Sequence, residues 1–354
     1  MATVKMKKLS LFILREQKDD LLRELMLLGC VEISAPDAIL SEPEAPGLVR
    51  QEPGGLEARL ADYHTLGKGL EIISRRFPEK RGRSKRLPKI TQKALLDEKE
   101  LPEYLDMAKA ILTLDAKSRL LSDEEAREQG FIESLEPWKS LNLPLNGETE
   151  QASVIIGTVP SSANIKALEK ALSSAVFEAS LSPASKSRDK HYIAIVCLRD
   201  RREDVLAALR PFSFYVSPLK NIAGTASENI ESASARISEM QNARAQILTQ
   251  IGEHAKQTDA LRRCYDLVGT QVARAEASEK LLATSSSFYL TGWAAAPSEA
   301  ALSGVFSKYI CAWELKDPSQ EELEAAPVTV KRRAPARLFD PLRINAKYVD
   351  VIRG

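Results

Sequence analysis

Cysteine and histidine are the side chains that most often hold a metal ion or act as nucleophile and base. This chain has four cysteines and three histidines. The cysteines lie far apart with no CxxC pair, and the histidines do not cluster with them: Cys30, Cys197, Cys264 and Cys311; His64, His191 and His254. A metal site needs ligands that come together. We therefore expect free thiols in a reducing compartment and no metal ligands.

No other catalytic arrangement is evident in the sequence. The segment GTVPSSANIK (Gly157–Lys166) lacks the spacing of a GxGxxG or Walker phosphate loop. No Ser-His-Asp triad, pair of carboxylates or Cys-His pair can be placed on facing elements. We expect a chain that is not an enzyme, with no catalytic residues, no cofactor-binding residues and no cofactor.

Two polar features, the basic loop Lys80–Lys89 and His254, can each be interpreted as functional or as purely structural. The basic loop Lys80–Lys89 could bind nucleic acid or anionic lipid. It contains no aromatic residue for stacking, so we interpret it as a solvated loop and expect no nucleic-acid partner. His254 could sense pH, but a tolerated polar residue on a helix seam is the simpler interpretation.

Composition indicates a folded protein of two or three domains. Hydrophobic residues make up 44% of the 354 residues, and the net charge of +1 gives no overall attraction to nucleic acid or acidic membranes. The N-terminus does not lead into the apolar core of a signal peptide. The sequence contains no run of about 18 apolar residues, so we expect no membrane span in it.

The rest of the chain is organised around Ser227–Ala283, about 57 residues without a proline. Small and apolar residues recur there at alternating three- and four-residue steps, which predicts a helix lying along a partner helix. At about 1.5 Å per residue this single helix would be about 86 Å long. The seam is interrupted by polar residues, where we expect looseness or bending: Arg244, His254, Thr258 and Glu279.

Helical spacing over Leu56–Phe77 and Ala94–Leu135 predicts two outgoing helices of about 64 residues together, which matches the returning helix. Residues 141–220 follow the order β-α-β-β-α-β of a ferredoxin-like sandwich, with Ser161 or Ser162 capping its first helix. Residues 4–33 and 287–315 each predict a β-α-β unit that is too small to be stable alone. We expect these two units to join, with Trp293 and Trp313 in their shared core.

The expected fold class is therefore α+β, with two ferredoxin-like α/β lobes at opposite ends of a long antiparallel helical coiled-coil hairpin. Residues 1–52 and 285–330 form the proximal lobe in this prediction, and residues 141–221 form the distal lobe. Residues 53–140 form the outgoing coiled-coil arm, residues 222–284 the returning helix, and residues 331–354 an exit segment.

Several stretches resemble subunit I of the V/A-type rotary ATPases, the counterpart of subunit a of the eukaryotic vacuolar proton pump. They occur in the family's order: Lys5–Ile33, LEPWKSLNLPL (Leu135–Leu145), VIIGTVP (Val154–Pro160), FYLTGWAAAP (Phe288–Pro297) and APVTVKRRAPARLFDPL (Ala326–Leu342). In the family a membrane half carrying the ion half-channels follows, whereas Arg343–Gly354 departs from the usual exit. The resemblance implies the cytoplasmic N-terminal half, at the cytoplasmic face of the membrane, of an integral membrane protein.

The resemblance also implies a function: a non-catalytic stator component that links peripheral stalks to the ion-translocating half. Such a rigid strut resists torque during ATP-coupled proton or sodium transport. The implied partners are peripheral-stalk heterodimers of the E and G type, the central-stalk subunit that caps the ring, and the protein's own membrane domain. The residues expected to bind a partner are Trp138, Ile156, Phe177, Phe212 and Phe214.

Two other classes are weighed against the stator. A ligand-sensing regulatory protein would use paired ferredoxin-like domains, but the rod separates the two expected lobes and no glycine-rich strand–helix turn marks a pocket. A coiled-coil tether of the chromosome-organising type would carry an ATPase head with Walker motifs, which this sequence lacks.

Overall fold

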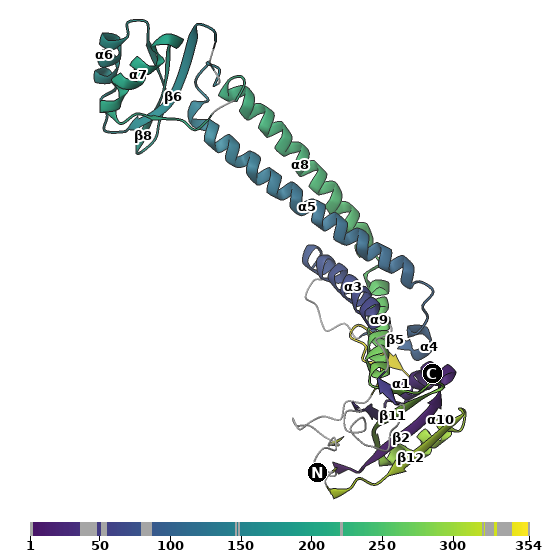
Figure 1. Ribbon diagram of the computed structural model, residues 1–354. Helices are drawn as coiled ribbons and strands as arrows, with labels where there is room; N and C mark the ends of the chain where they lie inside the picture. Colours follow the sequence, from purple (N-terminus) through teal and green to yellow (C-terminus); the bar gives the residue numbers. More distant parts are fainter. Residues whose placement is uncertain are drawn as a thin grey trace. The chain divides into compact units, whose positions relative to one another are not determined.

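The computed structural model describes residues 3–35, 48–50, 55–78, 87–145, 147, 149–219, 222–320, 322, 329–330 and 342–352. The chain divides into two compact units: a first unit of Met1–Thr113 with Gln250–Gly354, and a second unit of Leu114–Thr249. Each combines mainly antiparallel sheet with helices (Figure 1), so the fold class is α+β as predicted.

The main sheet of the first unit is made from both ends of the chain. Figure 1 shows the N-terminal strand β2 (purple) beside strands from near residue 300 (yellow-green). The strands are β2 (Met6–Leu14), β3 (Val31–Ile33), β4 (Val49–Arg50), β10 (Leu282–Ala283), β11 (Ser287–Ala295) and β12 (Cys311–Lys316). Their order is β12-β2-β11-β10-β4, all antiparallel, with β3 also paired to β11. The two terminal β-α-β units are thus joined in one sheet.

Two helices, α1 (Lys18–Leu28) and α10 (Glu299–Phe306), pack on one face of this sheet. Helix α1 buries Leu21 and Leu25 at helical spacing. It ends at Gly29, which takes a left-handed φ of 59° and donates its N–H to the Leu25 carbonyl. Alternate residues of β2 complete this core: Leu9, Leu11 and Ile13.

The first unit also contains a helical part. Helices α3 (Leu56–Arg76) and α9 (Thr258–Glu279) pack together, and the rings of Tyr63 and Tyr265 stack with centroids 4.2 Å apart. Beside them lie β5 (Lys89–Thr91), α4 (Gln92–Leu95) and β14 (Asp350–Ile352), with β14 parallel to β5. A further short pair joins β1 (Thr3–Val4) to β13 (Thr329–Val330).

Two long helices, α5 (Leu101–Leu135) and α8 (Ala226–Ala255), run through the boundary between the units. The single helix predicted over Ser227–Ala283 is wrong, because α8 ends at Ala255, α9 begins at Thr258, and Leu282–Ala283 is β10. At the break the Gln257 N–H donates to the His254 carbonyl, one residue closer than in an α-helix, and the Thr258 hydroxyl donates to the Ala255 carbonyl. No helix in the described part of the chain is long and apolar enough to cross a membrane.

The second unit has its own four-stranded sheet. Its strands are β6 (Ala152–Pro160), β7 (Ser180–Lys186), β8 (Lys190–Leu198) and β9 (Tyr215–Val216), in the antiparallel order β7-β8-β6-β9. Helices α6 (Ile165–Ala175) and α7 (Arg202–Leu209) bury Leu168 and Leu209 in one core with this sheet. Asn164 caps α6, in place of the predicted Ser161 or Ser162: its Oδ1 accepts from the N–H groups of Lys166 and Ala167.

The second core of this unit includes the C-terminal end of α5 and the N-terminal end of α8. The members of this core are Leu135, Trp138, Leu141, Leu145, Ile156, Ala194, Ala226 and Ile230. Residues Ile155 and Ile156 of β6 point into different cores. Both faces of the sheet are therefore covered, which explains the continuous apolar run Val154–Ile156.

Within the second unit, polar contacts join α5 to α8. Arg236 makes two hydrogen bonds to the Glu128 carboxylate, of 3.1 and 2.7 Å. Glu125 accepts from Arg244 and from the Gln241 amide. Arg244, predicted to interrupt the helix seam, is therefore paired across it.

We expect acid to weaken the pairing of α5 with α8. The amide of Gln241 and then the guanidinium of Arg244 hold the pKa of Glu125 below its ordinary value of 4.5. A carboxyl whose pKa is lower in the folded state contributes its stabilisation above the unfolded pKa and loses it as the pH falls through the folded pKa. Hydrogen exchange of α8 amides, corrected for intrinsic rates, should rise between pH 5 and the acid range below about 4. The Glu125→Gln variant should lack this step; an unchanged pH profile in that variant would contradict the assignment.

Candidate functional site

The five residues predicted to bind a partner are spread over different surroundings. Trp138 and Ile156 are buried in the core that includes the ends of α5 and α8. Phe212 and Phe214 are half-buried against the core with α6 and α7. Phe177 follows the C-terminal end of α6 and is 90% exposed. The partner-binding role of all five stays a prediction, and Phe177 is the most accessible of them.

Other exposed apolar side chains lie on the last strand of this sheet. Tyr215 is 70% exposed and Val216 is 44% exposed. Both belong to β9, which ends the sheet beside β6 and leaves its other edge without a strand among the described residues. Exposed edges of this kind are sites where another chain can pair.

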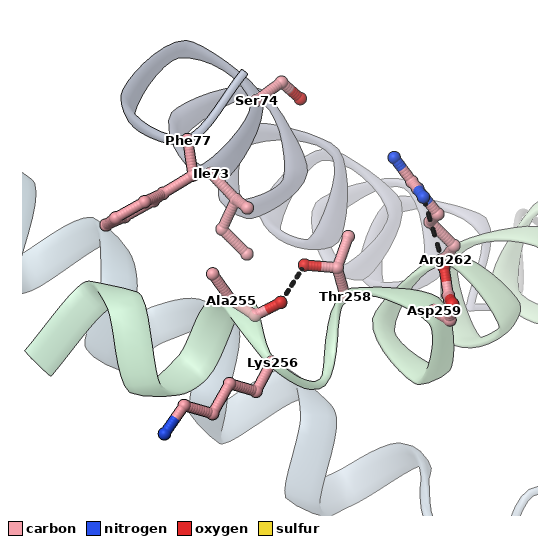
Figure 2. A pocket seen from close by; sticks show the side chains of 8 residues that line it. All are labelled: Ile73, Ser74, Phe77, Ala255, Lys256, Thr258, Asp259 and Arg262. Carbon is pink, nitrogen blue, oxygen red and sulfur yellow. Dashed lines mark hydrogen bonds and ion pairs between the residues drawn. The ribbon is translucent and has the colours of Figure 1, made fainter. Parts of the chain in front are cut away.

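The first unit has a cavity of about 410 Å³ beside the break between α8 and α9. Figure 2 shows it between the end of α3, which supplies Ile73, Ser74 and Phe77, and the chain from Ala255 to Arg262. Sequence reasoning missed this cavity because it depends on the helix break.

Two pairs of polar groups that line this cavity interact with each other. Arg262 donates to Asp259 over 3.1 Å, and its guanidinium lies 5.3 Å from the centre of the Tyr348 ring. The Thr258 hydroxyl donates to the Ala255 carbonyl, as Figure 2 shows. None of the lining side chains pairs a nucleophile with a base.

A second cavity of about 460 Å³ lies farther along α3 and shares Ser74 with the first. Its wall is formed partly by the tyrosines at positions 63, 265 and 348. The Lys347 amine lies 5.2 Å from the centre of the Tyr348 ring. Burial raises the pKa of Tyr265, so its phenol stays protonated at neutral pH. The backbone N–H groups of Lys347 and Tyr348 donate to Asp266, a residue that is 2% exposed.

Three of the four cysteines lack the surroundings of reactive thiols. Burial raises the pKa of Cys264 to about 11 and also raises the pKa of Cys197 and Cys311. A thiol with a raised pKa carries little of the nucleophilic thiolate at neutral pH. No cluster of three or more histidine, cysteine, aspartate or glutamate residues suited to a metal ion occurs among the described residues.

Three further predictions concern particular residues. The basic loop Lys80–Lys89 lies mostly outside the described residues. His254 is half-buried at the last turn of α8, and its carbonyl accepts from Gln257. Trp293 is half-buried, and Trp313 is 38% exposed with its ring 5.3 Å from that of Phe306. Trp313 thus lies at the margin of the core and is not enclosed by it.

Comparison with known proteins gives one similarity in sequence. The A-type ATP synthase subunit I of Methanocaldococcus jannaschii is 24% identical over 312 residues. The alignment covers 83% of this chain and 45% of that protein, so the chain spans less than half the length of this relative. No model of a protein family matches the sequence.

Comparison with solved structures gives the crystal structure of the cytoplasmic N-terminal domain of subunit I, homolog of subunit a, of V-ATPase. The match covers 87% of this chain and 99% of that chain, at 16% identity and a TM-score of 0.46.

Proposed function

We propose that this chain, which resembles subunit I of the A-type ATP synthases, is a non-catalytic stator component of a rotary ATPase. The observation that carries the proposal is the alignment with that subunit over 312 residues. The five stretches of sequence from Lys5–Ile33 to Ala326–Leu342 also resemble subunit I of the V/A-type rotary ATPases. In such a machine the chain would link peripheral stalks to the ion-translocating half and resist torque during ATP-coupled proton or sodium transport.

The long helices support a mechanical role. Helix α5 has 35 residues and α8 has 30, which correspond to about 52 and 45 Å at 1.5 Å per residue. Ion pairs on Glu125 and Glu128 join them within the second unit. Paired helices are much stiffer than a linker rich in glycine and serine, and a part that resists torque needs such stiffness.

We further propose that both sheets belong to ferredoxin-like sandwiches. Their neighbouring strands follow one sequence: β12-β2-β11-β3 in the first unit and β9-β6-β8-β7 in the second. If the four strands of each set are numbered along the chain, both sheets have the spatial order 4-1-3-2. Two helices in each set complete a β-α-β-β-α-β arrangement, which supports the assignment.

The partners we propose are peripheral-stalk heterodimers of the E and G type, the ring-capping subunit of the central stalk and the protein's own membrane domain. The chain would lie at the cytoplasmic face of the membrane within an integral membrane protein. For the second unit we place the stalk contact at Phe177, because a ring with 90% exposure costs little to desolvate and contributes apolar area on binding.

We expect Phe177→Ser to weaken binding of a purified peripheral-stalk heterodimer about tenfold, a change of about 1.4 kcal/mol. Biolayer interferometry on the whole chain measures the Kd directly. Leu120→Ser is the matched control, since Leu120 is 65% exposed on α5 and belongs to the same unit. An unchanged Kd for Phe177→Ser would remove this contact from the proposal. A wild-type chain that binds no stalk heterodimer would overturn the stator function itself.

A further inference from the structure

Residues 342–352, called here the C-terminal strap, contact three separate elements of the first unit. The Leu342 N–H donates to the Val31 carbonyl over 2.8 Å, and the Leu342 side chain is buried in the core of the sheet. At the other end, the Asp350 N–H donates to the Pro88 carbonyl over 2.9 Å, and β14 pairs in parallel with β5. Between these two ends the strap crosses α9.

At that crossing Asp266 of α9 receives three consecutive backbone N–H groups. Its Oδ1 accepts from Lys347 over 2.8 Å, and its Oδ2 accepts from Tyr348 over 2.7 Å and from Val349 over 3.0 Å. The rings of Tyr265 and Tyr348 meet edge to face above it, with centroids 5.6 Å apart. Arg262 also lies on the Tyr348 ring, so two further side chains of α9 contact the strap beside Asp266.

Neither helix propensity nor burial favours an aspartate at position 266. Aspartate is a poor helix former, and burying a carboxylate without partners carries a large desolvation cost. Burial raises the pKa of Asp266, and the hydrogen bonds from the three strap N–H groups act against that rise. The favourable contribution of the carboxylate therefore comes from the strap, through three charge-assisted hydrogen bonds.

The strap needs this carboxylate because its strand pairing extends over only a few residues. The pairing of β14 with β5 involves three residues on each strand, and isolated pairs of strands are marginally stable in water. Loss of Asp266 would also leave the Val349 N–H, which is buried, without its partner.

We propose that Asp266 and the C-terminal strap form a force-transmitting joint that couples helix α9 to the sheet of the first unit. The strap is fixed at Val31 of the sheet, at Asp266 of α9 and at β5, so tension on the strap reaches the helices directly. Asp266 acts as a positioning residue. The mechanical part of this inference rests on the proposed stator function; the existence of the joint does not.

Hydrogen exchange on the whole chain tests the joint. In the wild-type protein the amides of Lys347, Tyr348 and Val349 should be protected, and Asp266→Ala should speed their exchange at least about tenfold while α3 remains protected. Asp266→Asn should give a smaller effect, because an amide can accept some but not all of the three bonds. Glu276→Ala, which removes an exposed carboxylate from the same helix, should leave strap exchange unchanged.

The second measurement is made on the full-length protein in its rotary complex. We expect Asp266→Ala to lower the number of ions moved per ATP hydrolysed, with hydrolysis itself retained. Fast strap exchange with an unchanged ratio would overturn force transmission while leaving the joint. Strap amides that exchange at the wild-type rate in Asp266→Ala would overturn the joint. Failure of the wild-type protein to assemble into such a complex would instead count against the stator function.

Discussion

Gly292→Ala is expected to destabilise the first unit by about 3 kcal/mol, although it adds a single methyl group. A Cβ at this position would lie 2.2 Å from the Glu32 carbonyl oxygen and 3.1 Å from its carbon. Those atoms belong to the backbone of β3, which pairs with β11 at this point. Backbone in a paired strand cannot rotate away as a flexible side chain can, so the two strands must separate.

Gly304→Ala is the matched control, with the same substitution in the same unit. Gly304 lies in α10, and a Cβ there has no neighbour within 4 Å. Alanine is the better helix former, so this variant should be more stable by about 0.5–1 kcal/mol. The free energy of unfolding, measured with denaturant and circular dichroism, should fall in Gly292→Ala and rise in Gly304→Ala. Hydrogen exchange of β2 amides should show that both changes occur in the first unit. Equal stability of the two variants would contradict the close approach of β3.

The same argument explains the motif VIIGTVP of the second unit. A Cβ on Gly157 would lie 2.2 Å from the Phe214 ring and 2.5 Å from the Tyr215 carbonyl oxygen. Gly157 and Gly292 therefore occupy central strands where the chain approaches too closely for a side chain. Each glycine belongs to one of the stretches that resemble subunit I, Gly157 to VIIGTVP and Gly292 to FYLTGWAAAP.

The sequence predicted the elements whose signals are local. The β-α-β order predicted for residues 4–33 located β2, α1 and β3, and the order predicted for residues 287–315 located β11, α10 and β12. The joining of the two terminal β-α-β units followed from a physical requirement, since neither could bury enough surface alone.

Features that depend on tertiary contacts could not be predicted in the same way. The break after Ala255 was visible as polar seam residues, but the same residues are compatible with a continuous helix. Asn164 and the serines before it are equally good caps, so the sequence did not decide between them. No local pattern marks Asp266, because its partners lie 81 and 82 residues away in the chain.

The five predicted partner residues show the same limit. Large apolar side chains on strands and helix ends can be core or surface, and periodicity does not separate the two faces when both are covered. In the second unit both faces are covered. Trp138 and Ile156 are buried, whereas Phe177 is exposed. All three are apolar, so residue type alone does not distinguish them.

Trp138→Ala is expected to cost the second unit about 3–5 kcal/mol. The side chain is 2% exposed, and its ring meets that of Tyr192 edge to face with centroids 5.3 Å apart. It lies in the core that joins the sheet to the ends of α5 and α8, so truncation leaves a cavity between the sheet and both helices. Hydrogen exchange of β8 amides should therefore become faster, together with exchange at the N-terminal end of α8.

Phe177→Ala is the control for Trp138→Ala, since it removes an exposed aromatic ring from the same unit. It should change the stability by less than about 0.5 kcal/mol. A loss confined to the sheet, with α8 exchange unchanged in Trp138→Ala, would show that the cluster does not couple the sheet to the helix. In that case the sheet could open independently of the helices, and a stator contact made by the sheet would transmit little force to α5 and α8.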